Sequence, residues 1–148
     1  MVTEKQAWGA PPARGLEELW LSVLPLTWSS LAVVPVGAGL SARAAAAGVS
    51  TVASFFELAN LRVLESEGMS LADGARLQRE VRGLVAGGAR VVVSVDSPLF
   101  NPGAVPVVTG VDAAVLLARV GVSDLGEAER VIALIGRDRV IGCVTVGA

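Results

Sequence analysis

The chain has 148 residues, of which 53% are hydrophobic and 18% are charged, a composition typical of one ordered domain with a substantial core. Its formal net charge of -2 gives no attraction for phosphate backbones, so nucleic acid is not an expected partner. The absence of histidine excludes the common zinc sites, and the single cysteine, Cys143, excludes an internal disulfide. Because Cys143 lies in an apolar run, we predict a buried thiol and a reducing, cytoplasmic compartment.

The first residues differ from the rest of the chain. Residues 1–15 are polar and contain two adjacent prolines, which predicts a flexible N-terminal segment before a single α/β domain at residues 16–148. The stretch from Leu19 to Ala42 carries no charge and is long enough to span a bilayer. Pro25 and Pro35 interrupt it, so a short helix, a turn and a buried strand are favoured over a membrane segment, which stays open as an alternative.

The short helix is expected at residues 15–21, and the first strand at Leu31–Val36. Pro35 lacks an amide donor, so this strand should lie at the edge of the sheet or end early. Gly37-Ala38-Gly39 then turns the chain, and Ser41 can cap the alanine-rich helix that follows. Further on, five apolar residues fall at helical spacing and predict one buried helix face: Val52, Phe55, Phe56, Ala59 and Val63.

The second half of the chain alternates helices and strands more clearly. One helix is expected from Ser70 to the glycine pair at 87–88, and another from Asp124 to Gly136. Strands are expected at residues 91–95, 113–118 and 140–146. These strands are continuous runs of apolar residues without polar alternation, which indicates burial on both faces. The predicted fold class is α/β with three layers, a mostly parallel sheet with helices on both faces, P-loop or Rossmann-like.

Two features predict a ligand site at the carboxyl ends of these strands, where open α/β sheets bind their ligands. The sequence from Gly37 to Ala42 matches the G-x-G-x-x-A pattern of dinucleotide-binding loops, and Glu57 has the spacing of a ribose-binding acid. Asp96 follows a strand directly, and it either positions a hydrated metal ion or caps the turn made with Ser97 and Pro98. The candidate cofactor-binding residues are Gly37, Gly39, Ser41, Asp96 and Gly121, and Asp96 is also the candidate metal ligand. The ligands that fit these patterns are ATP–Mg²⁺ and the dinucleotides NAD and FAD.

The block from residue 89 to residue 148 resembles a known family. A strand ending in Val95-Asp96-Ser97-Pro98 is followed by the strand Ala114–Val120, the turn Gly121-Val122-Ser123, a helix and the strand that begins Val140-Ile141-Gly142. This order is similar to the second half of the bacterial tyrosine autokinases of capsule and exopolysaccharide export, which belong with the partitioning and septum-site ATPases of the deviant P-loop class. The resemblance implies a P-loop-related fold, a place for Asp96 beside magnesium, and a role next to polysaccharide-export or envelope machinery.

The reactive groups of that family are missing from the chain. Its single lysine is Lys5, and a P-loop needs a lysine beside its serine or threonine to neutralise the β- and γ-phosphates. There is no tyrosine to phosphorylate and no histidine to activate a serine nucleophile. The resemblance therefore implies a truncated or degenerate relative that lacks the P-loop, and no catalytic residue or cofactor is predicted.

The sequence favours a non-catalytic module that acts by self-assembly or by binding a protein partner. The alternative is an enzyme or sensor that binds a nucleotide or dinucleotide through the Gly37–Gly39 loop and Asp96. Trp8, Trp20 and Trp28 gather near the N-terminus, where they either pack the first segment onto the domain or form a contact for a partner. Both interpretations of these tryptophans stay open.

Overall fold

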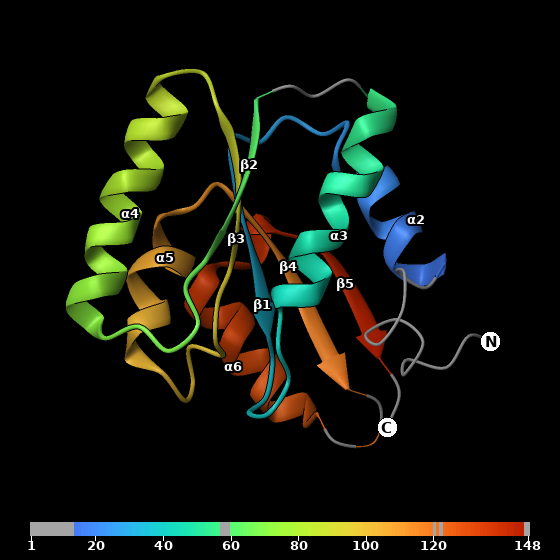
Figure 1. Ribbon diagram of the computed structural model, residues 1–148. Helices are drawn as coiled ribbons and strands as arrows, with labels where there is room; N and C mark the ends of the chain where they lie inside the picture. Colours follow the sequence, from blue (N-terminus) through green and yellow to red (C-terminus); the bar gives the residue numbers. More distant parts are fainter. Residues whose placement is uncertain (1–13, 57–59, 120, 122, 147–148) are drawn as a thin grey trace.

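The structure, a computed structural model, describes residues 14–56, 60–119, 121 and 123–146. Its centre is a five-stranded sheet made of β1 (Ser30–Pro35), β2 (Leu61–Glu65), β3 (Arg90–Ser94), β4 (Ala113–Arg119) and β5 (Val140–Val146). Each neighbouring pair is parallel, and the order across the sheet is β2-β3-β1-β4-β5 (Figure 1). The parallel sheet expected from the sequence is confirmed.

Helices cover both faces of this sheet. α2 (Arg14–Val23) and α3 (Arg43–Ala53) lie on one face, and α4 (Leu71–Ala86), α5 (Val105–Gly110) and α6 (Leu125–Ile135) lie on the other (Figure 1). Three single turns of 3-10 helix join the longer elements: η1 (Ser54–Phe56), η2 (Pro102–Ala104) and η3 (Arg137–Arg139). The result is the predicted three-layer α/β fold.

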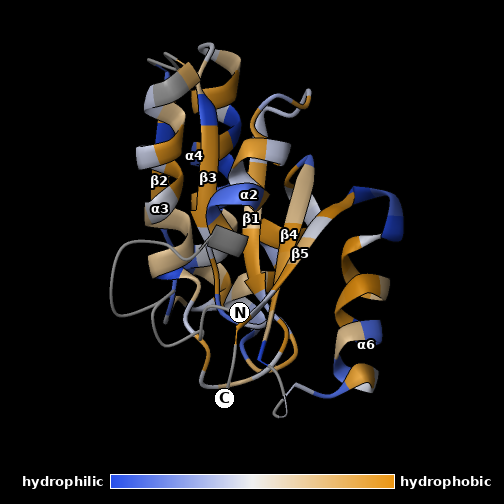
Figure 2. Cartoon of the chain, turned by 90° about the vertical axis from the view of Figure 1, so that its right-hand side faces the viewer, coloured by the Kyte–Doolittle hydropathy of each residue, from blue (hydrophilic) through white to orange (hydrophobic). Residues whose placement is uncertain are grey.

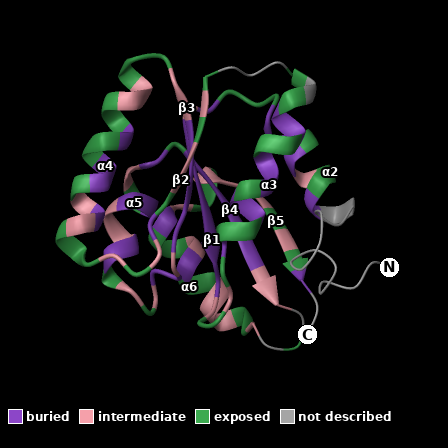
Figure 3. Cartoon of the chain, viewed as in Figure 1, coloured by how far each residue is buried: buried purple, intermediate pink, exposed green. Residues whose placement is uncertain are grey.

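The central strand shows why its sequence is apolar throughout. All six residues of β1 are buried. Leu31 and Val33 enter the core beneath α2 and α3, whereas Ala32 and Val34 enter the core beneath α4, α5 and α6. Because successive side chains point to opposite faces, a strand covered on both sides needs an apolar residue at every position. Figure 2 shows most of β1 and β3 in the hydrophobic colour, and Figure 3 shows β1 and most of β3 in the buried colour.

Of the two alternatives expected for the first strand, an edge position or an early end, the structure shows the early end. β1 lies in the middle of the sheet, paired with β3 on one side and β4 on the other. Pro35 is its last residue, so the missing amide falls where the ladder ends. The next amide, that of Val36, still donates to the carbonyl of Leu117 at 2.8 Å. A proline is tolerated at the end of a central strand for this reason.

The predicted helix face through Val63 is also wrong. α3 ends at Ala53, η1 follows it, and Val63 lies in β2 opposite Val92 of β3. Ala59, another residue of that face, lies outside the described residues. All residues of β2 are half-buried or exposed, because β2 is an edge strand of the sheet. An edge strand contains few apolar residues, so its sequence does not clearly indicate a strand, and apolar residues that fall at helical spacing by chance then favour the prediction of a helix.

The uncharged stretch from Leu19 to Ala42 is divided between the end of α2, a turn, β1 and the loop after it. Within the described ranges, no helix combines the length and the apolar character needed to cross a bilayer. Trp20 and Trp28 are buried in this region, and their indole N–H groups donate to the carbonyls of Ala45 at 3.1 Å and Val23 at 2.8 Å. These two tryptophans therefore pack the first helix and turn against the sheet. Trp8 lies outside the described residues, as does the predicted flexible segment except for its last two residues, which begin α2.

The expected burial of Cys143 is wrong. Cys143 lies in β5, the edge strand beside β4, and its side chain is exposed. Neighbouring atoms still remove part of the water around its sulfur, and this desolvation raises the pKa of the thiol. At neutral pH the group is therefore an accessible thiol rather than a reactive thiolate.

Candidate functional site

The chain path opens a crevice at the carboxyl end of β1. The connection that leaves β1 runs to α3 on one face of the sheet, whereas the connections that leave β3 and β4 run to α5 and α6 on the other face (Figure 1). Where the connections from neighbouring strands run to opposite faces of an open α/β sheet, the space between them at the carboxyl ends is the usual ligand-binding crevice. The sequence motif at 37–42 and the loop after β3 both lie at this edge.

A cavity of 260 Å³ occupies this crevice. Its wall on the β1 side is the segment from Gly37 to Leu40, and its wall on the β3 side contains Asp96, Ser97, Phe100 and Asn101. The structure thus brings together Gly37, Gly39 and Asp96, which the sequence proposed as one site from positions far apart in the chain. Their role in binding a cofactor stays a prediction.

The two glycines of the loop are under different constraints. Gly39 has a φ of 78°, a conformation that residues with a side chain rarely adopt. A Cβ at Gly37 would meet only Glu127 Oε1 at 3.7 Å, an ordinary contact distance. Of these two positions, only 39 has a backbone conformation that requires a glycine. Gly37 leaves open space at the crevice.

Asp96 holds two loops together. Its Oδ2 accepts hydrogen bonds from the backbone N–H of Gly68 at 2.7 Å and from Nδ2 of Asn101 at 2.7 Å. Gly68 belongs to the loop after β2, and Asn101 to the loop after β3. Ser97 does not take part, because its hydroxyl donates to the carbonyl of Val36 at 2.9 Å. The Asp96 carboxylate therefore bridges neighbouring loops instead of capping a turn together with Ser97 and Pro98.

Among the described residues, there is no group of three or more His, Cys, Asp or Glu side chains that could hold a metal ion, either around Asp96 or elsewhere. A magnesium ion held by one carboxylate needs its other ligands from water and substrate phosphates. Asp96 has the position for such a role, because it lines the cavity at the carboxyl edge of the sheet. The assignment of Asp96 as a metal ligand stays a prediction.

Two of the candidate residues lie away from this cavity. Ser41 is exposed, and its Oγ accepts a hydrogen bond from the backbone N–H of Arg43 at 3.2 Å. Ser41 lies one residue before the N-cap position of α3, which Ala42 occupies. Gly121, with a φ of 78°, belongs to the turn between β4 and α6 and does not line the cavity. Glu57, the candidate ribose-binding acid, lies outside the described residues.

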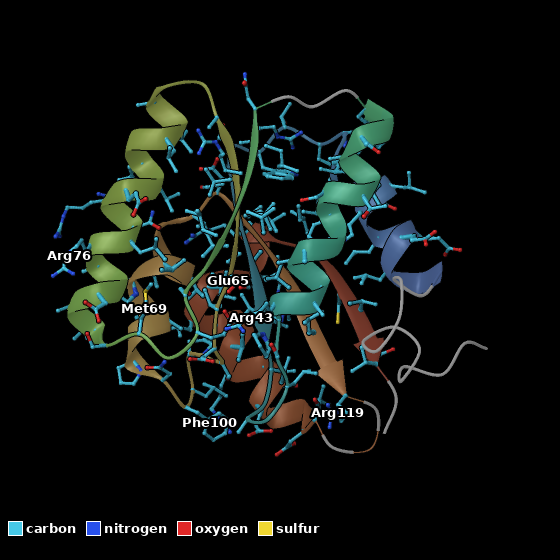
Figure 4. All side chains as sticks on the ribbon, viewed as in Figure 1. Arg43, Glu65, Met69, Arg76, Phe100 and Arg119 are labelled. Atoms are coloured by element: carbon cyan, nitrogen blue, oxygen red, sulfur yellow. The ribbon has the colours of Figure 1, made fainter. Side chains whose placement is uncertain are left out.

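Two arginines lie at this edge of the sheet, and neither of them lines the cavity. Arg43, in the first turn of α3, forms a salt bridge with Glu65 at the end of β2, at 3.1 Å from Nε to Oε2 (Figure 4). Arg119 ends β4, and its Nε is buried without a hydrogen-bond partner among the described residues. In place of a cation, the cavity wall carries Leu40 and the exposed ring of Phe100. The crevice is therefore partly apolar, and Asp96 is the charged residue among the described residues that line it.

The sequence did not predict that Leu40, Phe100 and Asn101 line the cavity. Asn101 carried a signal, because Asn-Pro-Gly marks a turn after a strand, but the bond from its amide to Asp96 depends on the loop conformation. Leu40 also had a signal. It directly precedes Ser41, and in a P-loop the residue directly before the serine or threonine is the phosphate-binding lysine.

Comparison with known proteins supports the fold and nothing more specific. No protein-family model matches the sequence, and no curated protein matches it either. The kinase domain of the Escherichia coli tyrosine kinase ETK superposes with a TM-score of 0.66 at 10% identity, covering 86% of this chain and 71% of that one. The BceF tyrosine kinase domain gives a TM-score of 0.64 at 11% identity and covers 89% and 76%.

The chimerical protein CapA2B2 gives a TM-score of 0.66 at 7% identity and covers 99% of this chain and 90% of that one. At such low identity a structural match establishes a common architecture and leaves activity undetermined. The resemblance found in the sequence is thus confirmed at the level of the fold: this chain has the three-layer α/β architecture of bacterial tyrosine kinase domains.

Proposed function

We propose that this chain is a non-catalytic module built on the fold of bacterial tyrosine kinase domains, and that it acts by binding a protein, either a partner or a second copy of itself. The observation that carries the proposal is the position of Leu40. It lies in the loop that leaves the central strand, directly before Ser41, and it lines the cavity there. A leucine at this position cannot neutralise the β- and γ-phosphates of a nucleotide.

The surrounding groups support the same conclusion. Arg43 is the next cation after Leu40 along the chain, and it pairs with Glu65. Asp96 accepts two hydrogen bonds from protein groups on one oxygen, which fits a structural role in joining loops. The chain also contains no tyrosine, so it has no acceptor for tyrosine autophosphorylation.

Apolar side chains at the same rim favour a protein as the ligand. Phe100 is 56% exposed, and Leu125, at the start of α6, is 74% exposed. Figure 4 places Phe100 at the lower rim of the molecule, where α6 also begins. Large apolar side chains of this kind are common anchors of protein interfaces and contribute little to the binding of phosphates. The setting that we propose is polysaccharide-export or other envelope machinery, in which the autokinases that the chain resembles operate.

Introducing the missing lysine should create nucleotide binding. Calorimetric titration of the unaltered protein with ATP–Mg²⁺ should show no saturable heat up to about 1 mM. Leu40→Lys should raise the affinity at least about tenfold, because an ammonium group there adds charge-assisted hydrogen bonds to phosphate oxygens. Leu40→Gln is the matched control, since it loses the same apolar packing without gaining a charge.

Two outcomes would contradict this account. Equal affinities for the lysine and glutamine variants would mean that the missing charge does not limit binding. Micromolar binding of ATP–Mg²⁺, NAD or FAD by the unaltered protein would favour the alternative function, a nucleotide- or dinucleotide-binding enzyme or sensor that uses Gly37, Gly39 and Asp96.

Self-assembly is tested by light scattering coupled to size-exclusion chromatography. If the rim that contains Phe100 and Leu125 joins two copies, the protein should elute with a multiple of the mass of one chain. The double variant Phe100→Ser and Leu125→Ser should then elute as single chains. Leu26→Ser is the matched control, because Leu26 is 48% exposed but lies in the turn before β1, at the opposite edge of the sheet. A stable monomer at all concentrations would leave only the binding of a different protein.

A further inference from the structure

On the side away from β2, the sheet ends at β5, a strand of seven residues (Figure 1). Its register with β4 shifts between Ala114 and Val115, and the pairing is regular from Gly142 to Val146. The backbone N–H and C=O groups of alternate residues point to opposite sides of a strand, so some of those in β5 point away from β4. Among the described residues, no strand pairs with this outer side. A row of hydrogen-bonding groups thus stands at this edge of the sheet.

The opposite edge of the sheet, formed by β2, carries charges. Arg62 and Glu65 belong to β2, and Glu65 forms the salt bridge with Arg43 of α3. Charged side chains on an edge strand oppose its pairing with another chain, because pairing removes water from them or brings like charges together. β5 contains no charged residue and no proline in its seven positions. Of the two edges, that of β5 therefore lacks the usual protection against pairing.

One face of β5 is fixed against the core, whereas the other is open. A Cβ at Gly142 would lie 2.8 Å from Cδ1 of Leu19, so α2 packs closely over the strand at this point. Val144 packs against the core on the same face. Cys143 and Thr145 alternate with these residues and are exposed. The strand is thus held in the extended conformation that pairing requires, so a partner strand does not have to order it.

The regular part of β5 suits pairing with a second copy of itself. In an antiparallel pair about a two-fold axis through Val144, Val144 faces its own copy, Cys143 faces Thr145, and Gly142 faces Val146. Apolar and β-branched side chains that face each other stabilise antiparallel pairs, whereas like charges destabilise them. Self-pairing brings together two identical strands, which have the same charges, so an uncharged strand favours it. A different protein would gain no specificity from charge at this edge.

We propose that β5 joins two copies of this chain through an antiparallel pair centred on Val144, so that two five-stranded sheets become one continuous sheet. This inference rests on the proposed function and specifies its self-assembly. The outer edge of β5 joins the copies, and the rim with Phe100 and Leu125 is left for a different protein.

Light scattering coupled to size-exclusion chromatography tests the pairing with charges at two exposed positions. The unaltered protein should have the mass of two chains. Cys143→Asp combined with Thr145→Asp sets like charges opposite each other and should elute as single chains. Cys143→Asp combined with Thr145→Lys is the matched control, because it sets opposite charges there and should remain a dimer. The rim variant Phe100→Ser with Leu125→Ser should remain a dimer as well.

A disulfide between the copies reports the register directly. The unaltered protein is mixed with the variant Cys143→Ser, Thr145→Cys, so that one copy has its cysteine at 143 and the other at 145. In the proposed register these two positions face each other with Cα atoms about 4.5 to 5.5 Å apart, within the span of a disulfide. Identical positions lie diagonally, about 7 to 8 Å apart and beyond that span. Oxidation of the thiols by diamide should therefore cross-link the mixture at least about tenfold faster than either protein alone.

Three results would overturn this inference. The first is a monomer at every concentration, and the second is a dimer that the two aspartates leave intact. The third is cross-linking of either protein alone as fast as that of the mixture, because the axis would then not pass through Val144. The proposed function fails separately: micromolar binding of ATP–Mg²⁺ by the unaltered protein would contradict it and leave the pairing of β5 in place.

Discussion

Replacing Gly74 by alanine should destabilise the fold by about 3 kcal/mol or more, at the upper end of what overpacking of a core costs. Gly74 is buried in the first half of α4. A Cβ there would lie 2.0 Å from the carbonyl oxygen of Gly103 in η2, and a Cβ at Gly103 would lie 2.0 Å from the carbonyl oxygen of Met69. The neighbours on both sides are backbone atoms, so no side chain can rotate away to make room. The free energy of unfolding measured by urea titration gives the loss directly.

The same helix supplies a control. Gly83 is exposed, and a Cβ at this position meets nothing within 4 Å. Gly83→Ala should therefore stabilise the protein by about 0.5 to 1 kcal/mol, because alanine is the better helix former. Opposite signs for two glycine-to-alanine changes in α4 would isolate the effect of packing from that of helix propensity. If both variants were stabilised, α4 and η2 would not approach as closely as described.

The contact between α4 and η2 also connects the core to the crevice. The N–H of Gly103 donates to Oδ1 of Asn101 at 2.9 Å, and Nδ2 of Asn101 donates to Asp96. Displacing Gly103 would thus disturb the residue that orients the Asp96 carboxylate. The position of the Asp96 carboxylate depends in this way on the close packing of Gly103 against Gly74 of α4.

The fold was largely predictable because burial on both faces leaves a simple pattern. The residues of β1, β3 and β4 are buried almost throughout, and each strand is a run of apolar residues that cannot belong to a half-exposed sheet. β2 escaped prediction because an edge strand keeps exposed residues such as Arg62. The central position of β1 could not be predicted from the sequence either, because long-range packing determines the order of strands in a sheet. Pro35 did not help, because a proline at the end of a strand is compatible with a central position, whereas one inside a strand favours an edge.

The candidate site was predictable only as far as it follows from the ends of strands. Residues just after β1 and β3 must meet, because neighbouring parallel strands end at the same edge, and this brings Gly37 near Asp96. Loop conformations carry no such rule. The bond between Asp96 and Gly68 joins loops whose shape depends on β2, which the sequence did not reveal. The place of the exposed Phe100 in the cavity wall likewise arises from the turn at 97–101.

Arg90 shows how a residue without any motif can decide stability. Its guanidinium donates to three carbonyl groups in the turn between α2 and β1: Nη1 to Leu24 at 2.8 Å, Nε to Trp28 at 3.1 Å and Nη2 to Leu26 at 3.1 Å. It also lies 3.8 Å from the centre of the Trp28 ring, in a cation–π arrangement. Partial burial lowers the pKa of Arg90, but guanidinium groups stay protonated in proteins. These contacts therefore persist across the pH range in which the protein is folded.

Arg90→Met should lower the free energy of unfolding by about 2 to 3 kcal/mol, because it leaves three carbonyls without their charged donor and removes the cation from the Trp28 ring. Arg90→Lys should recover only part of this loss, since one ammonium group cannot span the carbonyls that the planar guanidinium reaches. Arg79→Met, at an exposed position of α4, is the control and should stay within about 0.5 kcal/mol of the unaltered protein. Urea titration followed by tryptophan fluorescence measures all three. Equal stability of the Arg90 and Arg79 variants would mean that the turn holds its shape without Arg90, and that the packing of Trp20 and Trp28 alone fixes α2 against the sheet.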